Sequence, residues 1–361
     1  MWRDAKLATM LGCLLVFASA SCDARGAERA ADNPESTAIT GPAWPQPPAQ
    51  ARIRFIKSVG GASDWGVARS WWGRVVDTVT GRHEAQFVRP TGVAEGRGVL
   101  YVADPGAQAL VILDGPRHRE LRVARVGDIV LVSPVAVALG PQGTVYVADS
   151  RLQQVLQLDQ DGKLVSELSH DELQRPSSLA FDPLRHRLYV GDSKAHVVHI
   201  FDEHGGKVGS IGGLGAGPGQ FNSPTHVAVM ADGGVLVTDA LNFRVQAFDA
   251  DGRYTFKVGE LGDGAGNLAA PKGVAIDHAG HVYVADAMFD AVQVFDAAGR
   301  LMLGFGEQGT QAGQFWLPNG LFINGTDQLF VADAYNRRIQ VFQIVPEAAA
   351  AAVDGNRGQP R

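Results

Sequence analysis

The stretch from Phe315 to Phe342, FWLPNGLFINGTDQLFVADAYNRRIQVF, contains the pattern that decides the fold. A turn at Pro318 precedes a short apolar segment at residues 320–322, and a second one follows at residues 328–333. A polar loop then leads to a third segment at residues 338–342. Short apolar segments separated by Gly, Asn and Asp are typical of antiparallel β-strands. The stretch therefore predicts three consecutive strands.

The same pattern occurs six times along the chain. The turn prolines are Pro90, Pro134, Pro176, Pro224, Pro271 and Pro318. The aspartates that end the second predicted strands are Asp104, Asp149, Asp192, Asp239, Asp286 and Asp333. Successive aspartates are 45, 43, 47, 47 and 47 residues apart, a repeat length typical of β-propeller blades. We predict an all-β chain that forms one six-bladed β-propeller with one short helical insertion.

The first residues have the features of an export signal. Arg3 and Lys6 precede an apolar run of 14 residues, which ends in small residues before Cys22. A membrane-spanning helix needs roughly 20 residues, so a signal peptide at residues 1–21 is favoured over an uncleaved membrane anchor. Cys22 resembles the lipidated cysteine of bacterial lipoproteins. That resemblance implies a protein anchored in the membrane through Cys22, on the periplasmic side of the bacterial cell envelope.

Composition sets the remaining boundaries. Residues 22–51 are rich in Ala and Pro without apolar periodicity, which predicts a lipid-anchored linker. Residues 346–361 are predicted to form a disordered tail. Both cysteines lie in the leader region, so the domain between these segments has no internal disulfide. A net charge of −6 and the lack of a basic run argue against a nucleic-acid partner.

The propeller is predicted at residues 52–345, and its two ends are expected to meet. The last repeat lacks the outer strand that follows the other repeats, while residues 52–59 resemble such a strand. We therefore expect this segment to complete the sixth blade and close the ring. An insertion at residues 64–86 has apolar residues at helical spacing and includes Trp71 and Trp72. It is predicted to pack on the propeller as a helix, or to act as a lid or partner contact.

Two motifs carry a family resemblance. Gly219-Gln220-Phe221 and Gly313-Gln314-Phe315 precede the prolines of two repeats, and the same repeats share Asp-Ala-x-Asn-x-Arg-[Val/Ile]-Gln-x-Phe at residues 239–248 and 333–342. In these motifs the chain resembles the NHL-repeat family. The resemblance implies the propeller fold and leaves function open, because such folds host many activities.

Candidate site residues fall into two groups. The family loop pattern includes Asn242 with Arg244 and Asn336 with Arg338, for which we expect bridges to the neighbouring blade, with ligand contact as the alternative. If the family fold holds, residues just after the turn prolines face the channel mouth, and any ligand is expected there. The polar residues of this second group are Thr91, Ser177, His226, Lys272 and Asn319. For the repeated aspartates, bonds to backbone N–H groups of the following loop are expected.

Two enzyme families with related propellers provide the rival hypothesis. The resemblance to peptidylamidoglycolate lyases implies zinc held by several histidines near the prolines, where this sequence offers only His226. The resemblance to gluconolactonases implies a cation held by Glu, Asn and Asp. Of these ligands only the asparagine has a counterpart in this sequence, Asn319. His278 and His281, which flank a glycine turn expected at the opposite end, form the remaining metal candidate.

The sequence therefore favours a non-catalytic binding or scaffold module for a protein, peptide or glycan, without a cofactor. The alternative is a metal-dependent propeller enzyme with Zn or Ca at the propeller axis.

Overall fold

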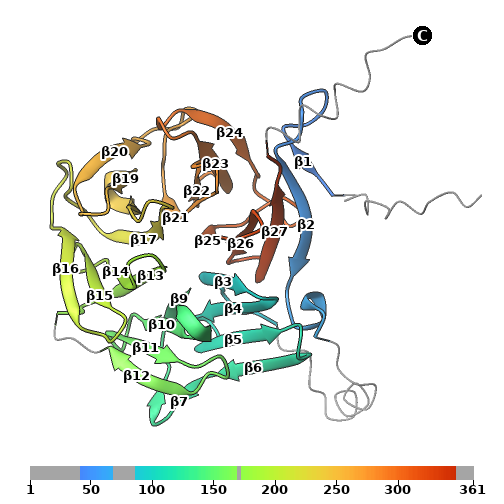
Figure 1. Ribbon diagram of the computed structural model, residues 1–361. Helices are drawn as coiled ribbons and strands as arrows, with labels where there is room; N and C mark the ends of the chain where they lie inside the picture. Colours follow the sequence, from blue (N-terminus) through green and yellow to red (C-terminus); the bar gives the residue numbers. More distant parts are fainter. Residues whose placement is uncertain (1–40, 68–85, 169–171, 347–361) are drawn as a thin grey trace, which may run out of the picture. The chain divides into compact units, whose positions relative to one another are not determined.

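The computed structural model describes residues 41–67, 86–168 and 172–346. Within this part, six antiparallel sheets are arranged radially around a central axis, as the predicted propeller requires (Figure 1). The prediction of an all-β, six-bladed propeller is confirmed. Most of the expected helical insertion, including Trp71 and Trp72, lies outside the described residues, as does Cys22. None of the described helices is long and apolar enough to cross a membrane.

Each blade runs from an inner strand at the axis to an outer strand at the rim. Blades one and two consist of β3 (Gly92–Gly96), β4 (Val99–Asp104), β5 (Ala109–Asp114) and β6 (Arg119–Val123), then β9 (Pro134–Leu139), β10 (Val145–Asp149), β11 (Gln154–Leu158) and β12 (Leu164–Leu168). Blades three and four consist of β13 (Pro176–Asp182), β14 (Arg187–Asp192), β15 (Val197–Asp202) and β16 (Lys207–Gly212), then β17 (Pro224–Val229), β18 (Val235–Asp239), β19 (Arg244–Phe248) and β20 (Tyr254–Val258).

Blade five consists of β21 (Pro271–Ile276), β22 (Val282–Asp286), β23 (Ala291–Phe295) and β24 (Leu301–Phe305). Blade six consists of β25 (Pro318–Ile323), β26 (Gln328–Asp333), β27 (Arg338–Ile344), β2 (Ile53–Val59) and β1 (Ala43–Trp44). A small hairpin of β7 (Arg125–Val126) and β8 (Ile129–Val130) lies between blades one and two. Short 3-10 turns occur at Ser63–Trp65, Pro141–Gly143 and Ala240–Asn242.

The core consists of six apolar layers, each between two neighbouring blades. The second strands are covered on both faces, so every residue of β10 and β22 is buried. The outer strands keep one face in water, and β12 and β20 accordingly alternate between less and more exposed residues. One layer joins Phe330 and Val341 of blade six to Leu100 and Val111 of blade one, so the ring is closed by apolar packing.

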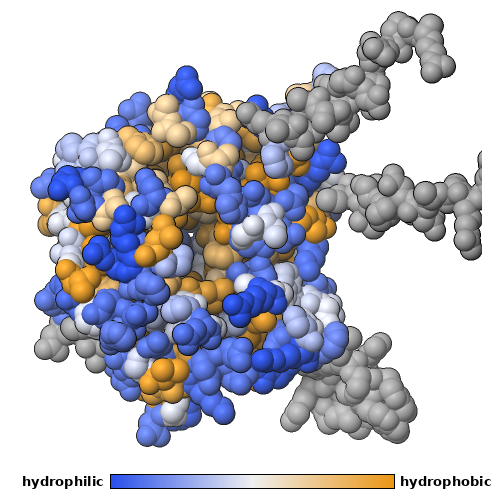
Figure 2. Space-filling view, in the orientation of Figure 1, coloured by the Kyte–Doolittle hydropathy of each residue, from blue (hydrophilic) through white to orange (hydrophobic). Residues whose placement is uncertain are grey.

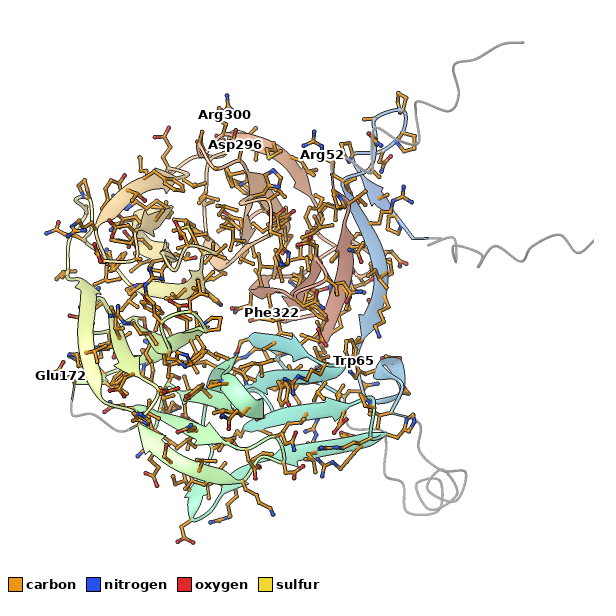
Figure 3. All side chains as sticks on the ribbon, viewed as in Figure 1. Arg52, Trp65, Glu172, Asp296, Arg300 and Phe322 are labelled. Carbon is orange, nitrogen blue, oxygen red and sulfur yellow. The ribbon has the colours of Figure 1, made fainter. Side chains whose placement is uncertain are left out.

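Hydrogen bonds also close the ring, within blade six. β2 pairs antiparallel with β27, with Ile53 opposite Ile344 and Val59 opposite Ile339. This pairing confirms that the segment starting at residue 52 supplies the missing outer strand. Trp65, which the sequence grouped with the insertion, lies at the seam between blades six and one (Figure 3). Its indole N–H donates to the Gly98 carbonyl at 2.9 Å, and the Lys57 ammonium lies 3.9 Å from its ring centroid.

The predicted linker extends too far toward the propeller. Residues 43 and 44 form β1, a fifth strand beside β2, so the ordered propeller begins before residue 51. The Trp44 ring lies 5.4 Å from Phe305 and 6.0 Å from Phe342, measured between ring centroids. A single tryptophan among prolines produces no periodic pattern, so sequence reasoning missed this strand.

We predict that Trp44→Ala lowers the free energy of unfolding by about 2 kcal/mol, because it removes aromatic contacts from the blade that joins the two ends of the ring. Thermal or urea unfolding of the full chain measures this change. Trp316→Ala is the control, since Trp316 is 45% exposed. Equal losses in the two variants would contradict a stabilising role for β1.

Neighbouring inner strands approach closely at the second residue after the turn proline. At Gly320 an added Cβ would lie 2.2 Å from the Thr91 carbonyl oxygen, and at Gly273 it would lie 2.3 Å from the Asn319 carbonyl oxygen. The Gly320 N–H donates to the same Thr91 oxygen at 3.0 Å. Glycine is therefore required where blade six meets blade one.

We predict that Gly320→Ala destabilises the propeller by about 1–3 kcal/mol, because the backbone of blade one cannot move aside without loss of packing. The measurement is the unfolding midpoint, which is expected to fall by a few degrees. Gly325→Ala is a matched control, since an added Cβ there meets nothing within 4 Å. A shift no larger than that of the control would show that the ring adapts easily.

Candidate functional site

Buried aspartates at the ends of the second strands organise one end of the propeller. All six are 0% exposed. Asp149 accepts N–H bonds from Val132 and Ser133, before the turn proline, and from Arg151 and Leu152, in the following loop. Asp104, Asp192 and Asp286 bind both segments in the same way. The expected bonds to the following loop are confirmed, and the sequence missed the bonds to the preceding segment.

In blades four and six, the buried aspartate accepts hydrogen bonds from side chains in place of the backbone N–H groups of the following loop. Asp333 accepts from the Asn336 amide at 2.9 Å and from Arg338 Nε at 2.7 Å. Arg338 also donates to the carbonyls of Thr310, Gln311 and Gln314, in the segment that arrives from blade five. Asn242 and Arg244 make corresponding bonds to Asp239 and to residues 215–220. These bonds confirm the expected bridges between blades.

A cavity of about 550 Å³ opens at this end of the channel. Five of the predicted ligand-binding residues line it together: Thr91, Ser177, His226, Lys272 and Asn319. The other four, Asn242, Arg244, Asn336 and Arg338, do not line it and are committed to the bonds within the blades described above. The structure thus brings together the five residues that were predicted from their position just after the turn prolines.

Two of the five lining residues also connect neighbouring blades. The Thr91 hydroxyl donates to the Val135 carbonyl at 2.9 Å, and the Ser177 hydroxyl lies 2.9 Å from the Pro224 carbonyl and 3.1 Å from that of Gly191. A hydroxyl has one hydrogen to donate. Thr91 and Ser177 can therefore accept a hydrogen bond from a ligand, but their own hydrogens hold the blades together.

Three cations line the mouth, of which sequence reasoning named only Lys272. Arg89 and Arg175 directly precede the turn prolines of blades one and three and also line the cavity. Within the described part of the chain, none of the three makes an ion pair. The sequence could have indicated both arginines, because each directly precedes a turn proline. The buried aspartate of the blade holds that position as well as the loop after the second strand.

His226 lies where the mouth narrows into the channel. Other blades have small residues at this position, such as Gly92 and Gly273. Its Nδ1 atom is buried and has no hydrogen-bond partner among the described residues. Burial, assisted by the charge of Lys272, lowers the pKa of His226 to about 3. The imidazole is therefore neutral near pH 7 and adds a hydrogen-bonding group without a charge.

The channel beyond His226 is apolar. A second cavity of about 310 Å³ is lined by inner-strand residues, almost all Gly, Ala, Val, Leu, Ile and Phe. Apolar residues are visible within the opening near the ring centre in Figure 2. The polar groups of the channel are thus concentrated at the mouth where the prolines lie.

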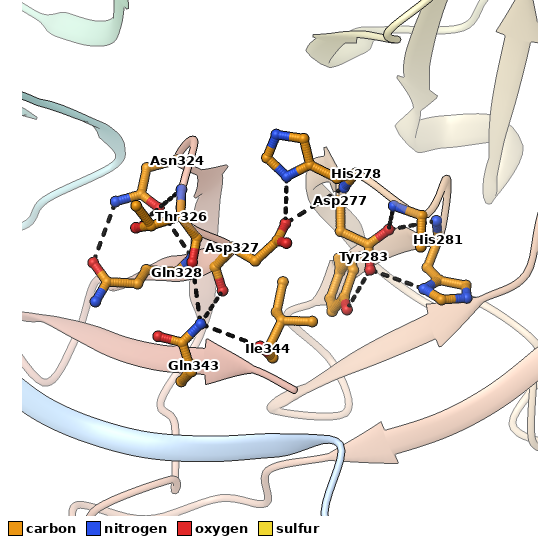
Figure 4. A network of polar contacts seen from close by, with 11 residues as sticks. Asp277, His278, His281, Tyr283, Asn324, Thr326, Asp327, Gln328, Gln343 and Ile344 are labelled. Carbon is orange, nitrogen blue, oxygen red and sulfur yellow. Dashed lines mark hydrogen bonds and ion pairs between the residues drawn. The ribbon is translucent and has the colours of Figure 1, made fainter. Parts of the chain in front are cut away.

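The opposite end of blades five and six contains the two histidines noted in the sequence (Figure 4). His281 Nδ1 lies 2.8 Å from Asp277 Oδ2, which also accepts from the Tyr283 hydroxyl at 3.0 Å. His278 Nδ1 lies 2.7 Å from Asp327 Oδ1 and so joins blade five to blade six. No group of three or more His, Cys, Asp or Glu side chains suited to hold a metal ion occurs among the described residues.

The comparisons with known proteins support the fold. A family model described as "6-bladed beta-propeller" matches residues 226–299. No curated protein matches the chain. The NHL-repeat assignment and the lipoprotein type stay predictions.

Several solved structures are similar to this chain. One is a protein of unknown function from Bacteroides thetaiotaomicron (TM-score 0.57, 16% identity, 72% of this chain and 70% of that chain). Another is a streptogramin B lyase (TM-score 0.56, 12% identity, 72% and 94%). A third is an auxiliary nutrient binding protein from Bacteroides thetaiotaomicron (TM-score 0.56, 15% identity, 71% and 69%). At these identities the likeness shows a shared propeller fold.

We predict that His226 makes the protein less stable in mild acid. Its folded-state pKa lies below the usual 6.5, so below about pH 6.5 the unfolded chain takes up a proton that the folded chain does not. Stability is then lost as the pH falls toward the folded pKa, by at most about 1.4 kcal/mol per pH unit.

Urea unfolding at pH 7 and pH 5 tests this. Wild type is expected to lose about 1–2 kcal/mol more than His226→Gln over this interval. His204→Gln, which removes a histidine with an 85% exposed side chain, is the control. Parallel losses in wild type and His226→Gln would contradict the prediction.

Proposed function

We propose that this protein is an exported, membrane-anchored binding module that recognises its ligand at the cavity beside the turn prolines, without catalysing a reaction. One observation carries the proposal: unused polar groups gather at this cavity. Lys272, Arg89 and Arg175 lack ion pairs there, and three buried polar atoms beside the two cavities lack partners in the described part of the chain: Ser178 Oγ, Thr225 Oγ1 and His226 Nδ1.

Unsatisfied buried polar groups cost free energy, about 1–3 kcal/mol each, which a ligand or water can recover. Elsewhere on this end of the propeller, the six aspartates and the groups that bind them hold the blades together. A concave site with a few convergent polar groups above an apolar channel is the usual form of a small-ligand site. One similar structure belongs to an auxiliary nutrient binding protein, which agrees with a binding role.

The location in the cell envelope follows from the leader, as proposed from Cys22 and the apolar run before it. The ligand then comes from outside the cytoplasm. Protein, peptide and glycan ligands are all compatible with a tethered module, and a cavity of about 550 Å³ favours a small molecule or the end of a chain over a folded surface.

The test is a thermal-shift screen of the full chain against oligosaccharides and short peptides. Asn319→Leu, which makes the mouth apolar, should weaken the binding of any hit about tenfold, because one ligand hydrogen bond is lost. Gln160→Leu is the control, since Gln160 lies in an exposed turn at the opposite end. Unchanged binding in Asn319→Leu would overturn the proposal. Binding that requires added zinc or calcium would favour the metal-dependent enzyme.

A further inference from the structure

The mouth is positively charged in a protein whose net charge is −6. Its lining contains Arg89, Arg175 and Lys272 and no Asp or Glu. In the loops that follow the second strands, the exposed charged residues are also basic, namely Arg151, Lys194 and Arg337. Acidic residues of this end, such as Glu260 and Glu307, follow the outer strands instead.

The six aspartates that end the second strands lie buried at the same end, as does Asp290 in the loop after β22, whose carboxylate accepts the Leu317 N–H. The carboxylates of the six are inaccessible, and those of Asp104, Asp149, Asp192 and Asp286 each accept several backbone N–H bonds. The other two of the six are paired with Arg244 and Arg338. Hydrogen bonds to a carboxylate compensate much of its charge, whereas the three lining cations make no ion pair with any residue that the structure describes. A ligand entering the mouth therefore meets positive charge first.

An exposed aromatic pair lies in the same blade as Asn319. Trp316 and Tyr335 are 45% and 51% exposed, with ring centroids 5.6 Å apart and planes inclined by 40°. The Tyr335 N–H donates to the Trp316 carbonyl at 3.2 Å, which fixes the two residues relative to each other. Tyr335 also lines the mouth. Exposed aromatic side chains with a polar tip suit ligands that have both an apolar face and polar edges.

The hydrogen-bonding groups of the mouth distinguish between acidic ligands. The carbonyls of Thr91, Val135 and Pro224 already accept bonds from neighbouring blades, whereas the lysine and the two arginines can only donate. The Thr91 and Ser177 hydroxyls and the Asn319 side chain can accept bonds from a ligand, but a peptide needs an acceptor for the backbone N–H of each of its residues. A saccharide with carboxylate or sulfate groups offers mostly acceptors, and its ring has an apolar face for the aromatic pair.

We propose that the mouth binds an acidic saccharide, with its anionic group held by Lys272 and the two arginines and a sugar ring packed on the Tyr335–Trp316 pair. This inference rests on the proposed function and specifies the class of ligand for the same site. Charge attracts and orients the acidic group, while the aromatic pair recognises the ring whether or not it is charged.

Calorimetric titration of the full chain tests the proposal, with three probes: α-1,4-linked trigalacturonate, its uncharged methyl ester and triglutamate. Trigalacturonate should bind at least about tenfold more tightly than the ester, and its affinity should fall as salt is raised from 50 to 300 mM. Lys272→Gln and Arg175→Gln should each weaken its binding about tenfold. Lys194→Gln, an exposed cation outside the lining, is the matched control and should have little effect.

The aromatic pair has its own signature. Trp316→Ala should weaken trigalacturonate and its methyl ester by the same factor, because it removes ring packing and leaves the charges in place. Changes in the His226 ring resonances on titration report that the probe occupies the mouth.

Three results would contradict the inference. Absence of trigalacturonate binding, or equal affinity for acid and ester, would rule out an acidic-saccharide site while leaving other ligands of the mouth possible. Triglutamate binding that is as tight and as sensitive to Lys272→Gln would assign the site to acidic peptides. The proposed function itself fails if binding of the hits from the screen is unchanged in Asn319→Leu, whichever class of ligand they belong to.

Discussion

The structure depends on a carboxylate buried at the end of every second strand. A buried charge is costly unless hydrogen bonds compensate for it. Each aspartate obtains these bonds from two separate loop segments. The segment before the turn proline and the loop after the second strand are thus held at the same point. Since this happens six times, the turn prolines and the residues beside them are gathered around one end of the channel.

The ring has to close as well as repeat. Its seams are apolar layers between neighbouring sheets, and no peptide link joins the last strand, β27, to β2, the strand from which the chain continues to blade one. The chain solves this by sharing one blade between its two ends, with β2 beside β27 and Trp44 packed against the buried rings of Phe305 and Phe342. Hydrogen bonds within a sheet then replace the missing covalent link, and the ring keeps no open edge.

The candidate site is recognised by what is left unused. Most polar groups at this end serve the framework: Thr91 and Ser177 connect blades, and Arg338 is held by Asp333 and three carbonyls. The side chains of Lys272, Arg89 and Arg175 make no such contact with the described residues, and His226 replaces the small residue found in other blades. The presence of residues that depart from the repeat, or whose side chains stay unpaired, is not explained by a contribution to the propeller framework. For that reason they are the best indicators of function.

The sequence by itself determined the repeat, the number of blades and the shared sixth blade, because prolines, aspartates and alternating apolar residues act locally and recur at a fixed spacing. The position of Lys272, His226 and Asn319 at the mouth was expected from the family resemblance, and these residues line the cavity. Only the tertiary structure decided that Asn336 and Arg338 are used within the blade, that Arg89 and Arg175 face the cavity, and that Trp44 belongs to the ring. Those roles depend on contacts between segments far apart in the chain, and a single unpaired side chain leaves no periodic signal.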